Sequence, residues 1–128
     1  MIQNPDGHKD IIQPQEIKRV LNNETSDKLK EMLVSVVENG HGKKAKVLGY
    51  KVAGKTGTAQ IPKPGGGYYE DRHIGSFIGF APVNDPKFLM LVRLDQPKNV
   101  KWAEESAAPT FGKMAKWLLD YYRLPPSE

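Results

Sequence analysis

Residues 49–60 read GYKVAGKTGTAQ, and this stretch decides the fold. Small, polar and apolar residues alternate along it without helical periodicity, which predicts a strand from Tyr50 to Ile61. The prolines at 62 and 64 and the glycines at 65–67 end that strand and predict a loop that reaches Arg72. The stretch is therefore expected to enter a sheet as a strand followed by a long surface loop.

Two apolar runs follow the loop, from Ile74 to Ala81 and from Phe88 to Leu94. The turn cluster at 82–86 between them (PVNDP) predicts an antiparallel hairpin. Both runs are nearly continuous in apolar or small residues, so we expect both faces of these strands to be covered.

One amphipathic helix is predicted on each side of the strands. In the first, Asn22 or Asn23 can cap the start, Asn39–Gly40 predicts a left-handed stop, and apolar residues recur at helical spacing at Leu29, Met32, Leu33, Val36 and Val37. In the second, Pro109 suits the first turn, Pro125–Pro126 forbid continuation, and the apolar face is Phe111, Met114, Ala115, Leu118, Leu119 and Tyr122. Three strands between two such helices predict an α+β fold, an antiparallel sheet flanked by N- and C-terminal amphipathic helices.

The N-terminal residues carry weaker signals. Asn4–Gly7 (NPDG) predicts a β-turn that joins extended pieces around Ile2 and Ile11–Ile12. A further short strand is expected from Glu16 to Leu21.

Composition sets broad limits. The 128 residues are enough for one domain, and 38% hydrophobic with 27% charged residues is ordinary for a globular protein. The formal charge of +4 is modest and does not indicate nucleic-acid binding. Without cysteine there are no disulfides or thiolate metal sites, and the three histidines lack ligand spacing, so no metal and no cofactor is expected. No apolar run approaches the ~20 residues that span a membrane, and neither a signal pattern nor an anchor is evident.

The residues Lys55, Thr56, Gly57 and Thr58 carry the chemistry. On a strand edge, lysine provides a point charge for a carboxylate, the threonines provide short donors, and glycine lets a ligand approach the backbone. Exposed amides of such an edge can pair with an extended peptide or donate to an oxyanion. The tripeptide K-T-G alone is too short to identify a family, and it also fits a solvated lysine on a strand edge.

Several longer blocks identify a family. The segments GYKVAGKTGTAQ, GSFIGFAPVNDPKF and AAPTFGKMAKWLLDYY occur in the order and spacing found at the end of the penicillin-binding transpeptidase domain, and the chain most resembles the monofunctional class B enzymes. The helix TSDKLKEMLVSVVENGHGKKA and the lead-in NPDG are also similar. The resemblance covers nearly the whole chain and implies a partial serine β-lactamase/transpeptidase-like fold, with residues 1–128 as the C-terminal portion of one domain.

The resemblance also implies a function, which is peptidoglycan cross-linking by a D,D-transpeptidase. In this family Lys55 would neutralise the carboxylate of a D-Ala-D-Ala stem peptide or a β-lactam, with help from Thr56 and Thr58, and the Thr58 amide would form half of the oxyanion hole. Gly57 would belong to the same substrate-binding strand. Expected partners are stem peptides, β-lactams, the missing N-terminal part of the domain and cell-wall synthesis proteins. The full-length family protein works outside the cytoplasmic membrane, behind an anchor.

The family nucleophile is absent. None of the five serines, at 26, 35, 76, 106 and 127, begins an S-x-x-K or S-x-N motif. Thr25–Lys28 has the spacing of S-x-x-K with threonine in the serine position, but it lies on the first helix, in the wrong part of the family order. We therefore predict that this chain has no catalytic residue and is inactive by itself. Without the nucleophile-bearing region, we also expect exposed apolar surface on the sheet and on the helix from Leu29 to Val37.

Two other functions fit the same residues. One is a non-catalytic module that binds a peptide or partner through this surface, and the other is a serine β-lactamase fragment, which would share the K-T-G strand. The block GSFIGFAPVNDPKF favours a transpeptidase over a β-lactamase.

Residues outside the motif are assigned mostly structural roles. His41 stands where the family commonly has threonine and is read as a solvated turn residue, and His8 and His73 are isolated. Lys43, Lys44 and Lys46 suit a helix exit. Tyr68 and Tyr69 either contact peptide stems or pin the loop. The aromatic residues expected in the core are Phe77, Phe80, Trp102 and Trp117.

Overall fold

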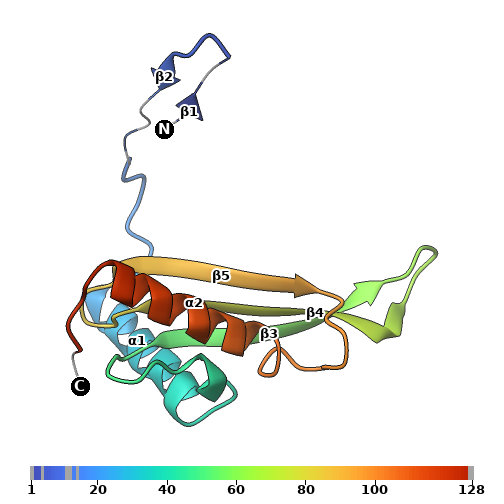
Figure 1. Ribbon diagram of the computed structural model, residues 1–128. Helices are drawn as coiled ribbons and strands as arrows, with labels where there is room; N and C mark the ends of the chain where they lie inside the picture. Colours follow the sequence, from blue (N-terminus) through green and yellow to red (C-terminus); the bar gives the residue numbers. More distant parts are fainter. Residues whose placement is uncertain (1, 4, 11–12, 14, 127–128) are drawn as a thin grey trace.

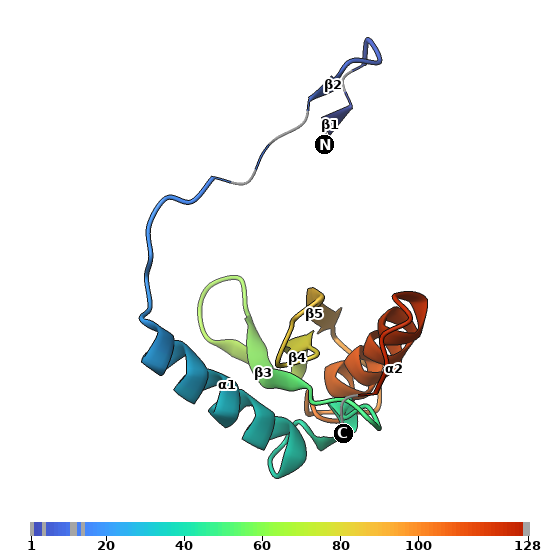
Figure 2. The ribbon, with the colours of Figure 1, turned by 90° about the vertical axis from the view of Figure 1, so that its left-hand side faces the viewer.

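A computed structural model describes residues 2–3, 5–10, 13 and 15–126 of the chain. The body is an antiparallel sheet of β3 (Ala53–Pro62), β4 (Tyr68–Ala81) and β5 (Phe88–Asp95), in that order. It is preceded by helix α1 (Asn23–Glu38) and followed by helix α2 (Ala107–Tyr121). Figures 1 and 2 show α1 beside β3, and α2 packs against β4 and β5. The predicted α+β fold is confirmed.

Helix α1 begins with a side-chain cap and ends without a left-handed residue. The Oδ1 atom of Asn22 accepts a hydrogen bond from the Thr25 amide at 2.7 Å, which identifies Asn22 as the cap. The predicted left-handed stop at Asn39–Gly40 is wrong, because Asn39 has φ −119° and Gly40 is not among the glycines with positive φ. A Cβ on Gly40 would lie 3.0 Å from the Val36 carbonyl oxygen, so close packing of the chain explains this glycine.

One face of the sheet forms the core with α2. The register places Thr56 opposite Phe77 and Phe77 opposite Val92, so these residues share that face. Phe77 is fully buried, and its ring centroid lies 4.7 Å from that of Phe111 on α2. Pro109 lies in the first turn of α2, as predicted. Burial of the two phenylalanines therefore fixes how the helix packs on the sheet.

The opposite face of the sheet is open. Lys55, Ile78 and Leu91 form one row across it, and Ile78 and Leu91 are 46% and 62% exposed. Leu89, on the same face, is 69% exposed, and Met32 of α1 is 66% exposed. The prediction that both faces are covered is wrong within the described residues, whereas the expectation of exposed apolar surface on the sheet and on α1 is confirmed.

The β3–β4 connection is shorter than predicted. Residues 68–72, expected in a loop, are strand, and Gln60 pairs with His73 and Pro62 with Tyr68. The turn occupies 63–67, where the Lys63 amide donates to the Gly67 carbonyl at 2.9 Å and three consecutive glycines adopt positive φ. Figure 1 shows this hairpin extending past the start of α2. Its residues pack on no core, which is why the sequence there lacks an apolar strand pattern.

The N-terminal residues form a short hairpin of β1 (Ile2–Gln3) and β2 (Lys9–Asp10). Figures 1 and 2 show it apart from the three-stranded sheet. The predicted turn at Asn4–Gly7 and the predicted extended piece at Ile11–Ile12 include residues that the structure does not describe. These residues are Asn4, Ile11 and Ile12. The strand predicted from Glu16 to Leu21 is wrong, because this charged segment has no strand partner and Ile17 is 92% exposed.

Candidate functional site

The four candidate residues lie together on β3, at one border of the sheet. Strand β3 pairs with β4 alone among the described strands, so its second edge is open. Lys55 and Thr58 are exposed, and Thr56 and Gly57 are half-buried. The predicted placement of Lys55, Thr56, Gly57 and Thr58 on an accessible strand edge is therefore what the structure shows; their role as ligand-binding residues remains a prediction.

The Lys55 side chain folds back onto its own strand. Its Nζ atom donates to the Thr56 carbonyl oxygen at 2.8 Å and approaches the Thr56 Oγ1 atom at 3.4 Å. The ammonium group is thereby held at the strand edge, next to the first threonine hydroxyl, where it can meet an anion.

The glycines around the lysine allow close packing of β3 on β4. A Cβ on Gly54 would lie 2.5 Å from the Phe77 ring, and one on Gly57 would lie 2.7 Å from the Ser76 Oγ atom. The Ser76 hydroxyl donates to the Gly57 carbonyl at 3.2 Å. Besides the ligand access expected from the sequence, these glycines therefore have a packing reason inside the sheet.

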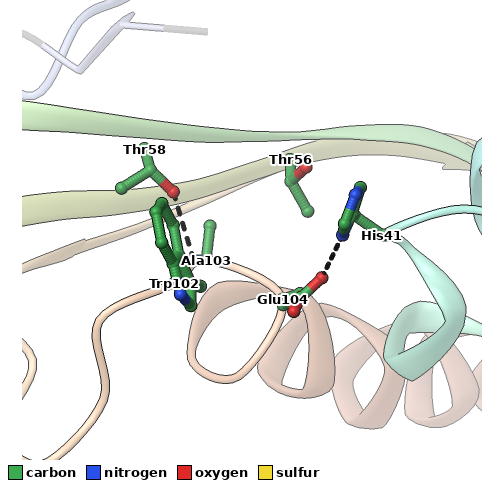
Figure 3. Close-up of a pocket in the computed structure, with 6 residues that line it drawn as sticks. All are labelled: His41, Thr56, Thr58, Trp102, Ala103 and Glu104. Carbon is green, nitrogen blue, oxygen red and sulfur yellow. Dashed lines mark hydrogen bonds and ion pairs between the residues drawn. The ribbon is translucent and has the colours of Figure 1, made fainter.

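A cavity of about 420 Å³ adjoins the threonines. Figure 3 shows it between β3 and the segment before α2, with the lining residues His41, Thr56, Thr58, Trp102, Ala103 and Glu104. The Thr58 Oγ1 atom accepts a hydrogen bond from the Ala103 amide at 3.2 Å, which ties this segment to the strand. The His41 Nδ1 atom lies 2.5 Å from the Glu104 Oε2 atom.

The sequence analysis missed Ala103 and Glu104 as lining residues and misassigned Trp102. Trp102 was expected in the core but is 51% exposed at the cavity, and Trp117 is 63% exposed on α2, so both core assignments are wrong. Phe77 is core, as predicted, and Phe80 is half-buried. His41 is exposed as expected, yet it pairs with Glu104, 63 residues away. A contact over that separation leaves no local pattern in the sequence.

The tyrosines at the hairpin have different surroundings. The Arg72 guanidinium lies 4.2 Å from the ring centroid of Tyr69, and the Lys63 Nζ atom lies 5.5 Å from it. Tyr69 thus pins the ribbon, which is one of its two predicted roles, while Tyr68 is 59% exposed.

The Thr25–Lys28 motif resembling S-x-x-K belongs to the start of α1, as predicted. The Thr25 amide binds the Asn22 cap and the Lys28 Nζ atom pairs with Glu24 at 2.7 Å. Among the described serines, Ser76 donates to the Gly57 carbonyl and the buried Ser106 donates to the Trp102 carbonyl. Ser127 lies outside the described residues.

Charged groups away from the cavity serve local structure. Lys46, at the exit of α1, forms an ion pair with Glu38. A hydrogen bond to Asp95 raises the pKa of Arg93, and one to Asp120 raises the pKa of Lys116. In the described part of the chain, no helix is long and apolar enough to cross a bilayer, and no cluster of acidic, histidine or cysteine side chains is arranged to hold a metal ion.

Known proteins share this sequence and this fold. Stage V sporulation protein D of Bacillus subtilis is 46% identical over 100 residues, which cover 77% of this chain and 15% of the relative. PbpB of Mycolicibacterium smegmatis, a penicillin-binding protein, is 38% identical over an alignment of 133 positions, which covers 96% of this chain and 20% of the relative.

Two solved structures extend the match. Apo penicillin-binding protein 3 of Mycobacterium tuberculosis has a TM-score of 0.80 at 34% identity, over 97% of this chain and 30% of that one. The apo transpeptidase domain of Burkholderia pseudomallei penicillin-binding protein 3 has a TM-score of 0.80 at 31% identity, over 94% and 37%.

The chain spans about a fifth or less of the length of these sequence relatives. The family model that describes the penicillin-binding protein transpeptidase domain matches residues 2–116. This chain therefore belongs to the penicillin-binding protein transpeptidase domain family.

Proposed function

We propose that this chain provides the substrate-binding strand of a peptidoglycan D,D-transpeptidase, as the C-terminal portion (1–128) of its transpeptidase domain. The observation that carries the proposal is the K-T-G stretch on an open strand edge beside a cavity. A stem peptide ending in D-Ala-D-Ala presents an extended backbone and a terminal carboxylate, and this edge offers partners for both.

Each of the four residues has a part in that binding. Lys55, already at the strand edge, and the hydroxyls of Thr56 and Thr58 would bind the carboxylate. The Gly57 carbonyl is directed toward β4, where it accepts a hydrogen bond from the Ser76 hydroxyl. Neighbouring residues of an antiparallel strand direct their backbone groups to opposite edges. The Thr58 amide then faces the open edge, where it can donate to an oxyanion.

The nucleophile would come from the remainder of the same domain. The open face with Ile78, Leu89 and Leu91 supports this, since apolar side chains exposed on one sheet face fit a covering layer of protein. We infer that this layer carries the nucleophilic serine and its lysine partner, and that the chain is inactive without it.

β-Lactams are the second proposed ligand class. The Mycobacterium tuberculosis relative has been solved with ampicillin, at a TM-score of 0.80 and 34% identity over 96% of this chain. By the same reasoning, the complete protein is proposed to act outside the cytoplasmic membrane, behind an anchor and with other cell-wall synthesis proteins.

A second candidate function is a non-catalytic module that binds peptides at the same edge. The unpaired edge of β3 beside the cavity supports it as well. The β-lactamase alternative has less support, since the matched relatives are penicillin-binding proteins and transpeptidases.

Ligand titration followed by amide NMR tests the binding proposal. Acetyl-D-alanyl-D-alanine should shift the amides of Lys55–Thr58, and its carboxamide analogue should shift them much less. Lys55→Met should weaken binding of the acid about tenfold or more, because it removes a charge-assisted contact. Lys51→Met, which removes an exposed lysine just before β3, is the matched control and should leave binding unchanged. Equal affinities for the acid and the carboxamide would rule out carboxylate recognition.

Covalent labelling with penicillin tests whether this chain contains a nucleophilic serine of its own. Fluorescent penicillin should leave the intact mass of this chain unchanged, because none of its five serines begins an S-x-x-K motif. A stoichiometric adduct would show that a serine of this chain acts as nucleophile.

A further inference from the structure

The His41–Glu104 pair closes one end of the cavity beside the threonines. His41 lies in the turn after α1, and Glu104 lies in the turn before α2. Their side chains meet at 2.5 Å between Nδ1 and Oε2, although 63 residues separate them. Figure 3 shows the pair opposite Trp102, with Thr56 above it on β3.

The charges around the cavity are uneven. Among its lining residues, His41 is the one whose side chain can carry positive charge, and Glu104 is the one that carries negative charge. Lys55 belongs to the opposite face of the sheet, in the row with Ile78, and its ammonium donates to the Thr56 carbonyl at the edge. An anion that enters the cavity therefore finds the two threonine hydroxyls and the His41 side chain, with the Lys55 ammonium 3.4 Å from the Thr56 hydroxyl at the strand edge.

We propose that His41 determines specificity for a ligand carboxylate bound in this cavity. As an imidazolium, His41 donates from Nδ1 to Glu104 and has Nε2–H left as a donor for the carboxylate. Glu104 acts as a positioning residue that fixes the ring. The inference rests on the proposed function, since it names the residue that binds the end of the same carboxylate-terminated peptide.

The cavity does not depend on this pair for its shape. The Ala103–Thr58 hydrogen bond of 3.2 Å holds the segment before α2 against β3. The His41 side chain is 83% exposed, and exposed ion pairs contribute little to folding. Substitutions at His41 and Glu104 are therefore expected to leave the fold intact, which makes them usable probes.

The experiment is a titration of the full 128-residue chain with acetyl-D-alanyl-D-alanine, followed through the Ala103 and Thr58 amides. His41→Thr should weaken binding about tenfold and leave binding of the carboxamide analogue unchanged, because one charge-assisted contact is lost. The double variant His41→Thr/Glu104→Gln decides the mechanism. If His41 binds the carboxylate directly, the double variant stays weak; recovery to wild-type affinity would show that His41 only neutralises Glu104, and would overturn the proposal.

The two proposals fail differently. If Lys55→Met weakens binding while His41→Thr does not, the edge strand binds the ligand and the inference about His41 is wrong. If Glu104→Gln weakens binding of acetyl-D-alanyl-D-alanine while His41→Thr does not, Glu104 acts without the histidine and the inference is again wrong. If acetyl-D-alanyl-D-alanine shifts no amide of the wild-type chain, both proposals fall.

Discussion

The absence of a side chain at Gly54 allows β3 to pack closely against Phe77 of β4. Replacing Gly54 with alanine puts a Cβ 2.5 Å from the Phe77 ring and 2.8 Å from the Ile78 carbonyl oxygen. Neither the buried ring nor the backbone can move away freely, so we expect Gly54→Ala to lower the free energy of unfolding by about 1–3 kcal/mol. Urea denaturation followed by circular dichroism measures the change.

Gly57→Ala is the matched control, because it adds the same methyl group to the same strand. Its Cβ would meet only the Ser76 hydroxyl, which can rotate, so the loss of stability should be the smaller of the two. Equal midpoints for the two variants would contradict the packing explanation for Gly54.

Single residues also show where sequence reasoning stops. The placement of Lys55–Thr58 on a strand followed from local alternation, and the structure agrees. The exposure of Trp102 and the contact between His41 and Glu104 depend on how two distant turns meet. A large aromatic residue favours burial on average, and the sequence around Trp102 carries no sign that the site is open.

At the scale of elements, the start of α1 depends on one side chain. The sequence left Asn22 and Asn23 as equal candidates, and the structure gives the cap to Asn22 through its 2.7 Å contact with the Thr25 amide. Asn22→Ala should lower stability by about 1 kcal/mol, whereas Asn23→Ala, at the first helical residue, should be neutral within about 0.5 kcal/mol. Thermal melts of the two variants side by side provide the test, and a larger loss for Asn23→Ala would reverse the assignment.

Elements that pack on the core were predicted well, and elements that do not were predicted poorly. Helix α2 and strand β5 were placed within a few residues, because the apolar residues of each recur at the spacing of a buried face. Phe111 in α2 and Val92 in β5 are buried members of these faces. Backbone pairing, which any residue can make, holds residues 68–72 in β4, and their polar sequence therefore predicted a loop. The end of α1 was misjudged because Gly40 serves close packing and not a left-handed turn.

For the whole molecule, the open sheet face predicts the solution behaviour. Leu89 and Leu91 are 69% and 62% exposed on one face, beside Ile78. The purified chain should bind a hydrophobic dye and elute larger than a monomer, as contiguous exposed apolar surface tends to associate. Size-exclusion chromatography with light scattering, together with dye fluorescence, measures both properties.

Leu89→Ser/Leu91→Ser should reduce dye binding and shift the chain toward monomer. Ile17→Ser is the control, since Ile17 is 92% exposed but lies outside the sheet. A wild-type chain that is monomeric and silent toward the dye would contradict the idea that another layer of protein normally covers this face.

The unpaired edge of β3 has a consequence for any binding measurement. Its free backbone groups can template a strand from another molecule of the same protein as readily as one from a peptide. Self-association along this edge and ligand binding are then mutually exclusive. The apparent affinity for a peptide should accordingly fall as the protein concentration rises, so that the chain acts as its own competitive inhibitor.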